Sequence, residues 1–203
     1  MDLKLSVKNR IIAIAKDSYE DEDYKYHILP VVKNALILGK KLNADLEVVE
    51  AAAYLHDIGR ATKRVNFVKE NEHHITGAAE TKKILEELRC PDAFVQKVCH
   101  CVLAHRGRKG PDPETLEAKI IANADAMAHF DTFLDLFDFF LKSSGSFEEA
   151  ILALEQKMDR DWNKKLTLPE AKKTVREKYE AILVLIKSQK EYFENEKKSS
   201  MDN

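Results

Sequence analysis

The spacing of apolar residues constrains the fold of this chain more than any other feature of its sequence. Apolar residues recur every three or four positions instead of alternating, a pattern typical of helices with one buried face. Only 6 glycines and 5 prolines interrupt the 203 residues. Because these two residue types are the strongest local breaks in regular structure, the sequence predicts an all-α fold, arranged as a single-domain helical bundle.

The expected helices can be delimited from caps and breaks. In chain order they cover residues 5–14, 27–42, 44–59, 73–89, 91–106, 113–130, 147–162 and 168–193. Asp45 is a typical N-cap for the third helix and Gly59 its expected stop, whereas Pro30 is tolerated only if it lies in the first turn of the second. The sixth helix could either stop near residue 130 or continue into the aromatic run 131–141.

One loop signal divides the chain. The polar stretch "KSSGS" separates a core domain, residues 1–142, from a helical extension, residues 143–195, which we expect to pack on the same core as a cap. The charged residues 196–203 have no apolar face and predict a disordered tail.

Charge and cysteine content limit the partners. Lys and Arg number 33 against 35 Asp and Glu, which gives no general surface for polyanions. The basic stretch "RGRKG" could contact nucleic acid, but a small phosphorylated ligand is favoured, and a homo-oligomer is left open. The odd number of cysteines, the lack of a signal peptide and the absence of a run of about 20 apolar residues predict a cytoplasmic protein without a membrane partner.

The segment "LHDIGR" places His56 and Asp57 at the end of an apolar helix. A buried carboxylate is costly unless it is paired or bound to a metal, so this pair requires partners from other helices. His27 and Asp125 are the candidates, the latter in the alanine-rich run "IANADAMA", which lets helices approach closely. His and Asp suit a divalent ion such as Mn, Fe, Co, Ni, Mg or Zn. The alternatives are an ordinary helix-capping histidine and a solvent-facing aspartate.

These residues give the sequence a family resemblance. The segments "YHILPVV", "LHDIGR", "HHITGAAETKKIL" and "PETLEAKIIANADAM" resemble, in this order, motifs of the HD-domain metal-dependent phosphohydrolases. The sequence is most similar to small bacterial and archaeal HD proteins with a helical C-terminal extension. The resemblance implies a helical bundle of the HD-domain type with C-terminal cap helices.

The resemblance also implies roles for individual residues. The implied metal ligands are His27, His56, Asp57 and Asp125. His73 and His105 would line the substrate pocket or hold a second metal, with His74 as a rival for the first and His100 for the second. Basic residues that could clamp a phosphate tail are Arg60, Lys63, Arg64 and Arg106. Relatives commonly have arginine where this chain has Pro30, so another residue does that work here, or none does.

A metal held by two imidazoles and two carboxylates suits phosphate hydrolysis, because it activates water and polarises phosphorus. The expected activity is removal of phosphate or pyrophosphate from a small phosphorylated metabolite, and the family favours a nucleotide. One alternative is phosphodiester cleavage of a cyclic or linear nucleotide. Another is a non-catalytic module that senses a nucleotide or a metal.

Overall fold

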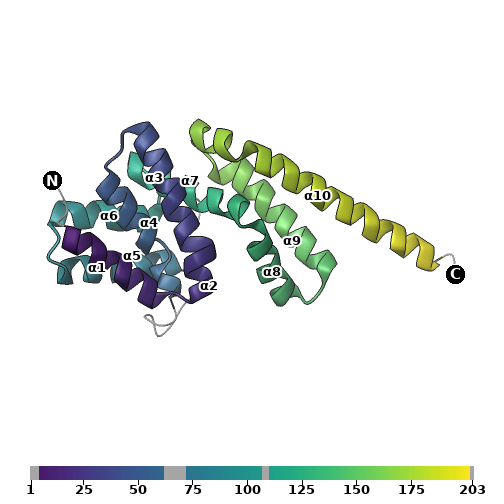
Figure 1. Ribbon diagram of the computed structural model, residues 1–203, viewed down its shortest axis with the longest axis horizontal. Coiled ribbons are helices and arrows are strands. Elements are labelled where there is room, and N and C mark those ends of the chain that lie inside the picture. Colours follow the sequence, from purple (N-terminus) through teal and green to yellow (C-terminus); the bar gives the residue numbers. More distant parts are fainter. Residues whose placement is uncertain (1–4, 62–71, 107–109, 202–203) are drawn as a thin grey trace. The chain divides into compact units, whose positions relative to one another are not determined.

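The computed structural model describes residues 5–61, 72–106 and 110–201. Within these ranges the chain forms helices joined by short turns and contains no strand, which confirms the predicted all-α class (Figure 1). Contacts divide the chain into two compact units, Met1–Ala128 and His129–Asn203, and the division lies inside helix α7. The sequence had placed a boundary later, at residue 142.

The first unit holds most of the helices. They are α1 (Leu5–Ser18), α2 (Asp21–Asp23), the π-helical turn η1 (Tyr24–Ile28), α3 (Leu29–Leu42), α4 (Leu46–Leu55), the 3-10 turn η2 (Ile58–Arg60), α5 (His73–Glu87), α6 (Asp92–Ala104) and most of α7 (Leu116–Asp131). Helix α4 packs against α1, α3 and α6, while α5 packs against both α6 and η2. The end of α4 and the start of α5 are therefore brought together through η2.

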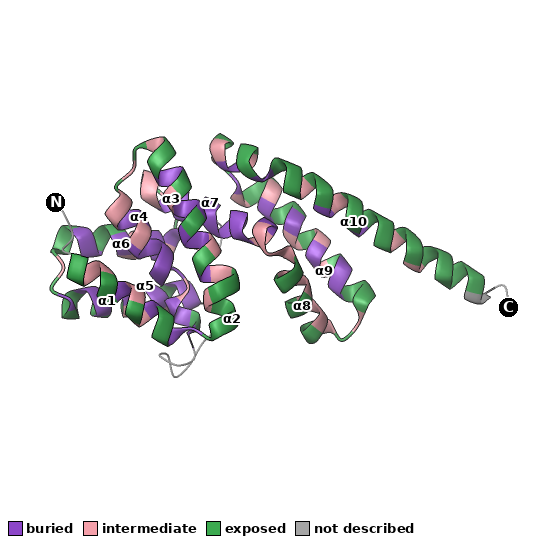
Figure 2. Ribbon diagram, in the orientation of Figure 1, coloured by how far each residue is buried: buried purple, intermediate pink, exposed green. Residues whose placement is uncertain are grey.

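Helix α7 forms the centre of the first unit. All residues from 120 to 128 are buried, and four of them are alanines (Figure 2). Small side chains let neighbouring helices approach the backbone closely. Asp125 lies in this stretch and is only 5% exposed, as its alanine-flanked setting predicted.

A π-helical turn precedes Pro30 and contains His27. In η1 the Leu29 N–H donates to the Tyr24 carbonyl, five residues earlier. Pro30 has no N–H, and it lies in the first turn of α3, as the sequence required. Such widened turns are frequent at functional sites, and this one contains His27.

Helix α4 begins as predicted but ends early. The Asp45 carboxylate caps it by accepting a hydrogen bond from the Val48 N–H at 3.4 Å. Its last residue is Leu55 instead of Gly59, because the backbone leaves the helical conformation at Asp57, with φ −106° and ψ 16°. The HD pair therefore lies at a break in the backbone.

The second unit contains α8 (Phe133–Ser144), α9 (Phe147–Arg160), the π-helical turn η4 (Asp161–Lys165) and α10 (Pro169–Met201). Helix α9 packs against both α8 and α10. The aromatic run does not continue α7, because Thr132 interrupts the helix between them at φ −124° and ψ 41°. The sequence predicts a disordered tail from residue 196, but α10 continues as far as Met201.

A buried ion cluster links helices of the second unit. Asp161 is fully buried, and its Oδ2 atom lies 2.6 Å from Lys157 Nζ and 2.8 Å from His129 Nδ1. Burial alone would raise the pKa of Asp161, but His129 and Lys157 outweigh it and hold the pKa below its ordinary value. His129 is thus a partner in this cluster.

None of the helices in the described ranges combines the length and apolar character needed to cross a membrane.

The buried ion cluster predicts a pH-dependent stability. Replacing Asp161 by Asn should cost about 3 kcal/mol at pH 7, because it leaves buried cationic groups unpaired. A carboxylate with a depressed pKa stabilises above its unfolded pKa and stops doing so as the pH falls, so the difference from wild type should shrink between about pH 5 and pH 3. Trp162, the single tryptophan and the neighbour of Asp161, reports urea unfolding of this unit by fluorescence.

The matched control is Asp159→Asn, which changes an exposed carboxylate on α9 and should shift stability by less than about 0.5 kcal/mol. Equal effects of the two substitutions, or a difference that does not change with pH, would contradict the assignment.

Candidate metal centre

His56 is oriented by the end of helix α4. The ring is fully buried, and its Nδ1 atom lies 2.9 Å from the Ala53 carbonyl oxygen. A carbonyl can only accept, so Nδ1 carries the hydrogen and Nε2 presents its lone pair. Burial lowers the pKa of His56 to about 4, so the ring is neutral near pH 7. The side chain caps the helix and presents a nitrogen lone pair to the cluster at the same time.

His105 repeats this arrangement at the end of helix α6. Its Nδ1 atom donates to the Val102 carbonyl at 2.6 Å, again three residues earlier in the chain. The ring is 2% exposed. Its Nε2 atom is therefore also fixed as the nitrogen with a lone pair, and it points toward the end of α4.

The carboxylate of Asp57 lies at the centre of the cluster. Its Oδ2 atom is 3.5 Å from His27 Nε2 and 3.8 Å from His56 Nε2. Its Oδ1 atom is 3.3 Å from Nε2 of both His73 and His105. One carboxylate thus faces two pairs of imidazoles, each through a different oxygen.

The surroundings keep Asp57 ionised. Burial acts to raise the pKa of Asp57, but Arg60 and His56 lead the groups that lower it, and the pKa lies well below its ordinary range. Arg60 contributes through its Nε atom, 3.6 Å from Asp57 Oδ1. The site therefore carries a buried negative charge.

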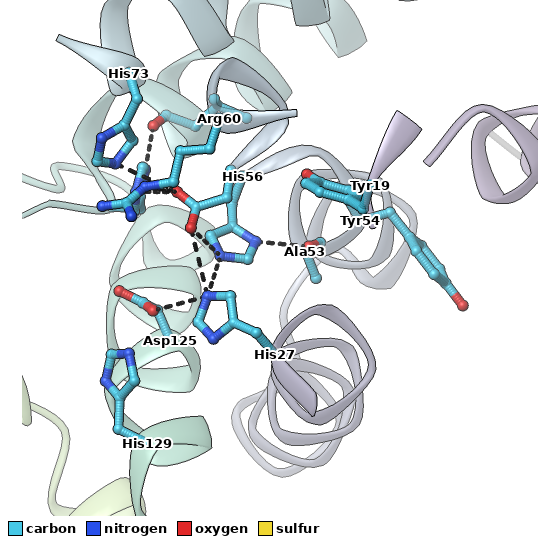
Figure 3. A network of polar contacts seen from close by, with 12 residues as sticks. Tyr19, His27, Ala53, Tyr54, His56, Arg60, His73, Asp125 and His129 are labelled. Carbon is cyan, nitrogen blue, oxygen red and sulfur yellow. Dashed lines mark hydrogen bonds and ion pairs between the residues drawn. The ribbon is translucent and has the colours of Figure 1, made fainter. Parts of the chain in front are cut away.

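Asp125 and His27 complete the cluster from two other helices. His27 Nε2 lies 3.5 Å from Asp125 Oδ1 and 3.2 Å from His56 Nε2 (Figure 3). Burial acts to lower the pKa of His27, but Asp57 and Asp125 outweigh it, so the pKa is raised. His27 Nε2 is therefore adjacent to His56 and to both carboxylates, where η1, the end of α4 and α7 meet.

The donor set fits a divalent metal. The ligand atoms of His27, His56 and Asp57 lie within 4.8 Å of one another, and those of Asp57, His73 and His105 form a second such group. Two nitrogens bound at right angles to one ion, each about 2.1 Å away, are about 3 Å apart, close to the separation of His27 and His56. Asp57 Oδ1 is buried yet accepts no hydrogen bond from the described residues, as expected for a ligand atom.

Two glycines, Gly59 and Gly77, allow the turn that follows His56 and Asp57 to lie directly on helix α5. This turn, η2, is called the HD turn below. A Cβ atom on Gly59 would lie 2.1 Å from the His73 carbonyl oxygen and 2.6 Å from the Gly77 nitrogen. Both contacts are with backbone, so no side-chain rearrangement can relieve them. This close approach places His73, the first residue of α5, beside Asp57.

The structure places the rival histidines away from Asp57. His100 lies on another part of α6, where its Nε2 atom accepts a hydrogen bond from the Glu114 N–H at 3.2 Å. His74 is buried beside Gly110, whose added Cβ would lie 3.2 Å from the His74 ring. His73 therefore lies beside Asp57 where His74 does not, and His105 lies there where His100 does not.

The basic residues expected at the site are placed only in part. Arg60 contacts Asp57, while its side chain remains 47% exposed. Arg106 is half-buried just after the end of α6. Lys63 and Arg64 lie outside the described residues.

Sequence reasoning missed one contributor, Tyr19. Its hydroxyl donates to the carbonyl of Tyr54, in the last turn of α4, at 3.2 Å. The two residues are 35 positions apart, and no local pattern connects them.

Fold and site together define an all-helical domain with a His/Asp cluster of the kind that holds divalent metal ions. The HD domain family matches residues 24–129, which include every residue of the cluster. The chain belongs to this family, whose members bind divalent metals, and the predicted resemblance is confirmed.

Relatives share this region in different contexts. A tRNA (cytidine(56)-2'-O)-methyltransferase of Picrophilus torridus is 30% identical over 143 residues, 64% of this chain and 38% of that protein. A Ribonuclease Y of Desulforudis audaxviator is 32% identical over 102 residues, 50% of this chain and 17% of that protein. The chain therefore spans less than half the length of these relatives.

Solved structures share the fold over nearly the whole chain. Bacillus subtilis YpgQ in complex with ADP has a TM-score of 0.73 at 20% identity and covers 92% of this chain and 95% of its own. A predicted HD superfamily hydrolase from an uncultured Thermotogales bacterium has a TM-score of 0.60 at 20% identity, covering 91% and 92%. The fold is that of HD-superfamily hydrolases.

The contact between the HD turn and α5 predicts a sharp glycine requirement. Gly59→Ala should destabilise the protein by about 2–3 kcal/mol in urea unfolding, because the new methyl group meets backbone. Gly39→Ala is the control, since its Cβ would meet only side-chain atoms of Leu46 and Val49, and alanine favours a helix. Similar stability of the two variants would contradict the close approach.

Proposed function

We propose that this protein is a metal-dependent phosphohydrolase that releases phosphate or pyrophosphate from a nucleotide. The observation that carries the proposal is the largely buried Asp57 carboxylate, flanked through its two oxygens by two pairs of histidines. A largely buried anion beside the Nε2 lone pairs of His56 and His105 is costly by itself and favourable around a cation.

His27, His56, Asp57 and Asp125 are the proposed metal ligands. The Ala53 carbonyl orients His56, and the π-helical turn orients His27. A bound divalent ion would supply an activated water and would polarise the phosphorus centre. The protein residues hold their donor atoms in place before the ion arrives, which limits the cost of ordering them.

His73 and His105 are proposed to act on the other side of Asp57. Both Nε2 atoms lie 3.3 Å from Oδ1, so they either hold a second ion or carry a proton to the leaving group. The hydrogen bond from His105 Nδ1 to Val102 fixes Nε2 as the atom that gains and loses this proton.

Arg60 is the proposed contact for the phosphate tail. Its guanidinium group lies 3.6 Å from Asp57, but about half of its side chain is exposed, so it can turn to a phosphate without leaving a buried site. Arg106, Lys63 and Arg64 are proposed to assist, as their positions in the sequence after α6 and the HD turn predict.

A nucleotide is the favoured substrate because the site combines a metal centre with arginine near the point where α4 ends. Support comes from Bacillus subtilis YpgQ, which shares the fold and was crystallised with ADP. The second candidate is phosphodiester cleavage, favoured by the similarity to Ribonuclease Y over 102 residues. The two reactions use the same centre and differ in the bond that water attacks.

The test is metal content and turnover of the wild type beside His56→Ala and Asp57→Ala. Phosphate, pyrophosphate and nucleotide products are assayed on nucleoside triphosphates, linear dinucleotides and cyclic nucleotides with Mn, Co, Ni, Mg or Zn. Both variants should lose bound metal and at least about 100-fold in kcat/KM. His100→Ala is the control, because this ring lies away from the cluster and should leave both properties unchanged.

The product identifies the reaction. Release of phosphate or pyrophosphate from a triphosphate supports the proposal, whereas cleavage of dinucleotides supports the phosphodiesterase. Tight metal-dependent nucleotide binding without turnover would indicate a sensor, and wild-type protein without divalent metal would overturn all of these assignments.

The raised pKa of His27 predicts pH-dependent metal binding. Protons and metal compete for its Nε2 atom, and the protonated form persists above the ordinary pKa of 6.5. The affinity for Mn²⁺, measured by titration calorimetry, should rise up to about tenfold per pH unit between about pH 6 and pH 8. His56 adds no dependence in this range, because its pKa is about 4. A flat profile would show that protonation of His27 does not control binding.

A further inference from the structure

The last carbonyl groups of helix α4 have specific side-chain partners. The last turn of a helix leaves its carbonyls without intrahelical donors, and a buried carbonyl needs another one. The Ala53 carbonyl receives the His56 ring N–H at 2.9 Å. The next carbonyl, that of Tyr54, receives the hydroxyl of Tyr19 at 3.2 Å (Figure 3). The two bonds lie immediately before Asp57.

Tyr19 reaches this point from the end of helix α1. Its backbone N–H bonds to the Ala15 carbonyl at 3.2 Å, which continues the helical turn, and the residue is 3% exposed. Burial, together with the charge of Asp57, raises the pKa of Tyr19 well above its ordinary value, so the hydroxyl stays protonated and donates. The backbone of Asp57 also acts on this hydroxyl and lowers its pKa, but by less than burial raises it.

The Tyr19 hydroxyl therefore lies at the break between helix and turn. It donates to the carbonyl of Tyr54, three residues before Asp57. The preceding carbonyl, that of Ala53, is bonded to the His56 ring. The phenol thus satisfies a backbone carbonyl that the end of the helix leaves over, directly beside the one that orients His56.

We propose that Tyr19 is a positioning residue of the metal centre, whose hydroxyl holds the turn in which His56 and Asp57 face the same ion. This inference rests on the proposed metal-binding function. Residues that orient ligands from behind influence metal affinity about 10- to 100-fold in other metal sites.

Loss of the hydroxyl has a defined consequence. Phenylalanine keeps the ring and its packing but leaves the Tyr54 carbonyl without its bond to the phenol. The turn is then biased toward continuing the helix, in which neighbouring side chains point about 100° apart. Asp57 would turn away from the histidines that it contacts at 3.3 to 3.8 Å.

The experiment compares Tyr19→Phe with Tyr54→Phe. The Tyr54 side chain lines a separate cavity of about 330 Å³ between α1, α3 and α4. Tyr54→Phe therefore also removes a phenol oxygen, but it keeps the backbone carbonyl that accepts the bond from Tyr19. Calorimetric titration with Mn²⁺ at pH 7.5 should give a Kd raised at least about tenfold for Tyr19→Phe and changed less than about twofold for Tyr54→Phe.

A stability control separates positioning from general loosening. Ile11→Val, in the core of the same helix α1, should lower the melting temperature without changing the Kd for Mn²⁺. If the Kd values of Tyr19→Phe and wild type are equal, or if Ile11→Val weakens binding as much as Tyr19→Phe at equal stability, the proposal is overturned.

Amide hydrogen exchange of the metal-free proteins tests the same contact without metal. Tyr19→Phe should exchange faster than the wild type at the amides of His56 and Asp57, because the end of α4 loses its anchor at the Tyr54 carbonyl, while the middle of α4 is unchanged. Equal exchange at these two amides in both proteins overturns the proposal. A wild type that binds no Mn²⁺ overturns the proposed function and the positioning role together, whereas a loss of Mn²⁺ binding confined to Tyr19→Phe overturns neither.

Discussion

The largely buried carboxylate of Asp57 is the constraint on which the rest of the site depends. A negative charge removed from water is stable only beside compensating charges or donors, and here the nearest groups are imidazole nitrogens and one half-exposed arginine. His56 cannot compensate it by protonation near pH 7, because burial lowers its pKa to about 4. The arrangement is therefore best suited to a cation between the histidines and the carboxylates.

Helix ends supply both the geometry and the protonation state of the site. His56 and His105 each follow the last residue of a helix, and each donates from Nδ1 to the carbonyl three residues earlier. The same hydrogen bond satisfies a backbone group that the helix leaves over and fixes the tautomer of the ring. The folding of α4 and α6 therefore also orients these two rings, which explains why the clustered histidines lie at helix ends.

Close backbone packing then brings these ends together. Gly59 and Gly77 let the HD turn lie on α5, and the alanines of α7 let Asp125 reach the interior of the first unit. These small residues are recognisable in the sequence, but their contacts are not, because each joins segments far apart in the chain. The bond from the Tyr19 hydroxyl to the Tyr54 carbonyl also joins residues far apart in the chain. In the second unit, the contact between His129 and Asp161 does so as well.

The sequence by itself determined the helical class, the Asp45 cap and the His/Asp residues that gather at one site, because apolar periodicity, capping and the HD pattern are local signals. Only the tertiary structure decided that α4 ends at Leu55, that α7 and α8 are separate, and that His73 and His105 lie at Asp57 while His74 and His100 do not. Adjacent histidines look alike in sequence. Which of them faces Asp57 depends on helix rotation and on contacts with distant backbone groups, and these are set by packing.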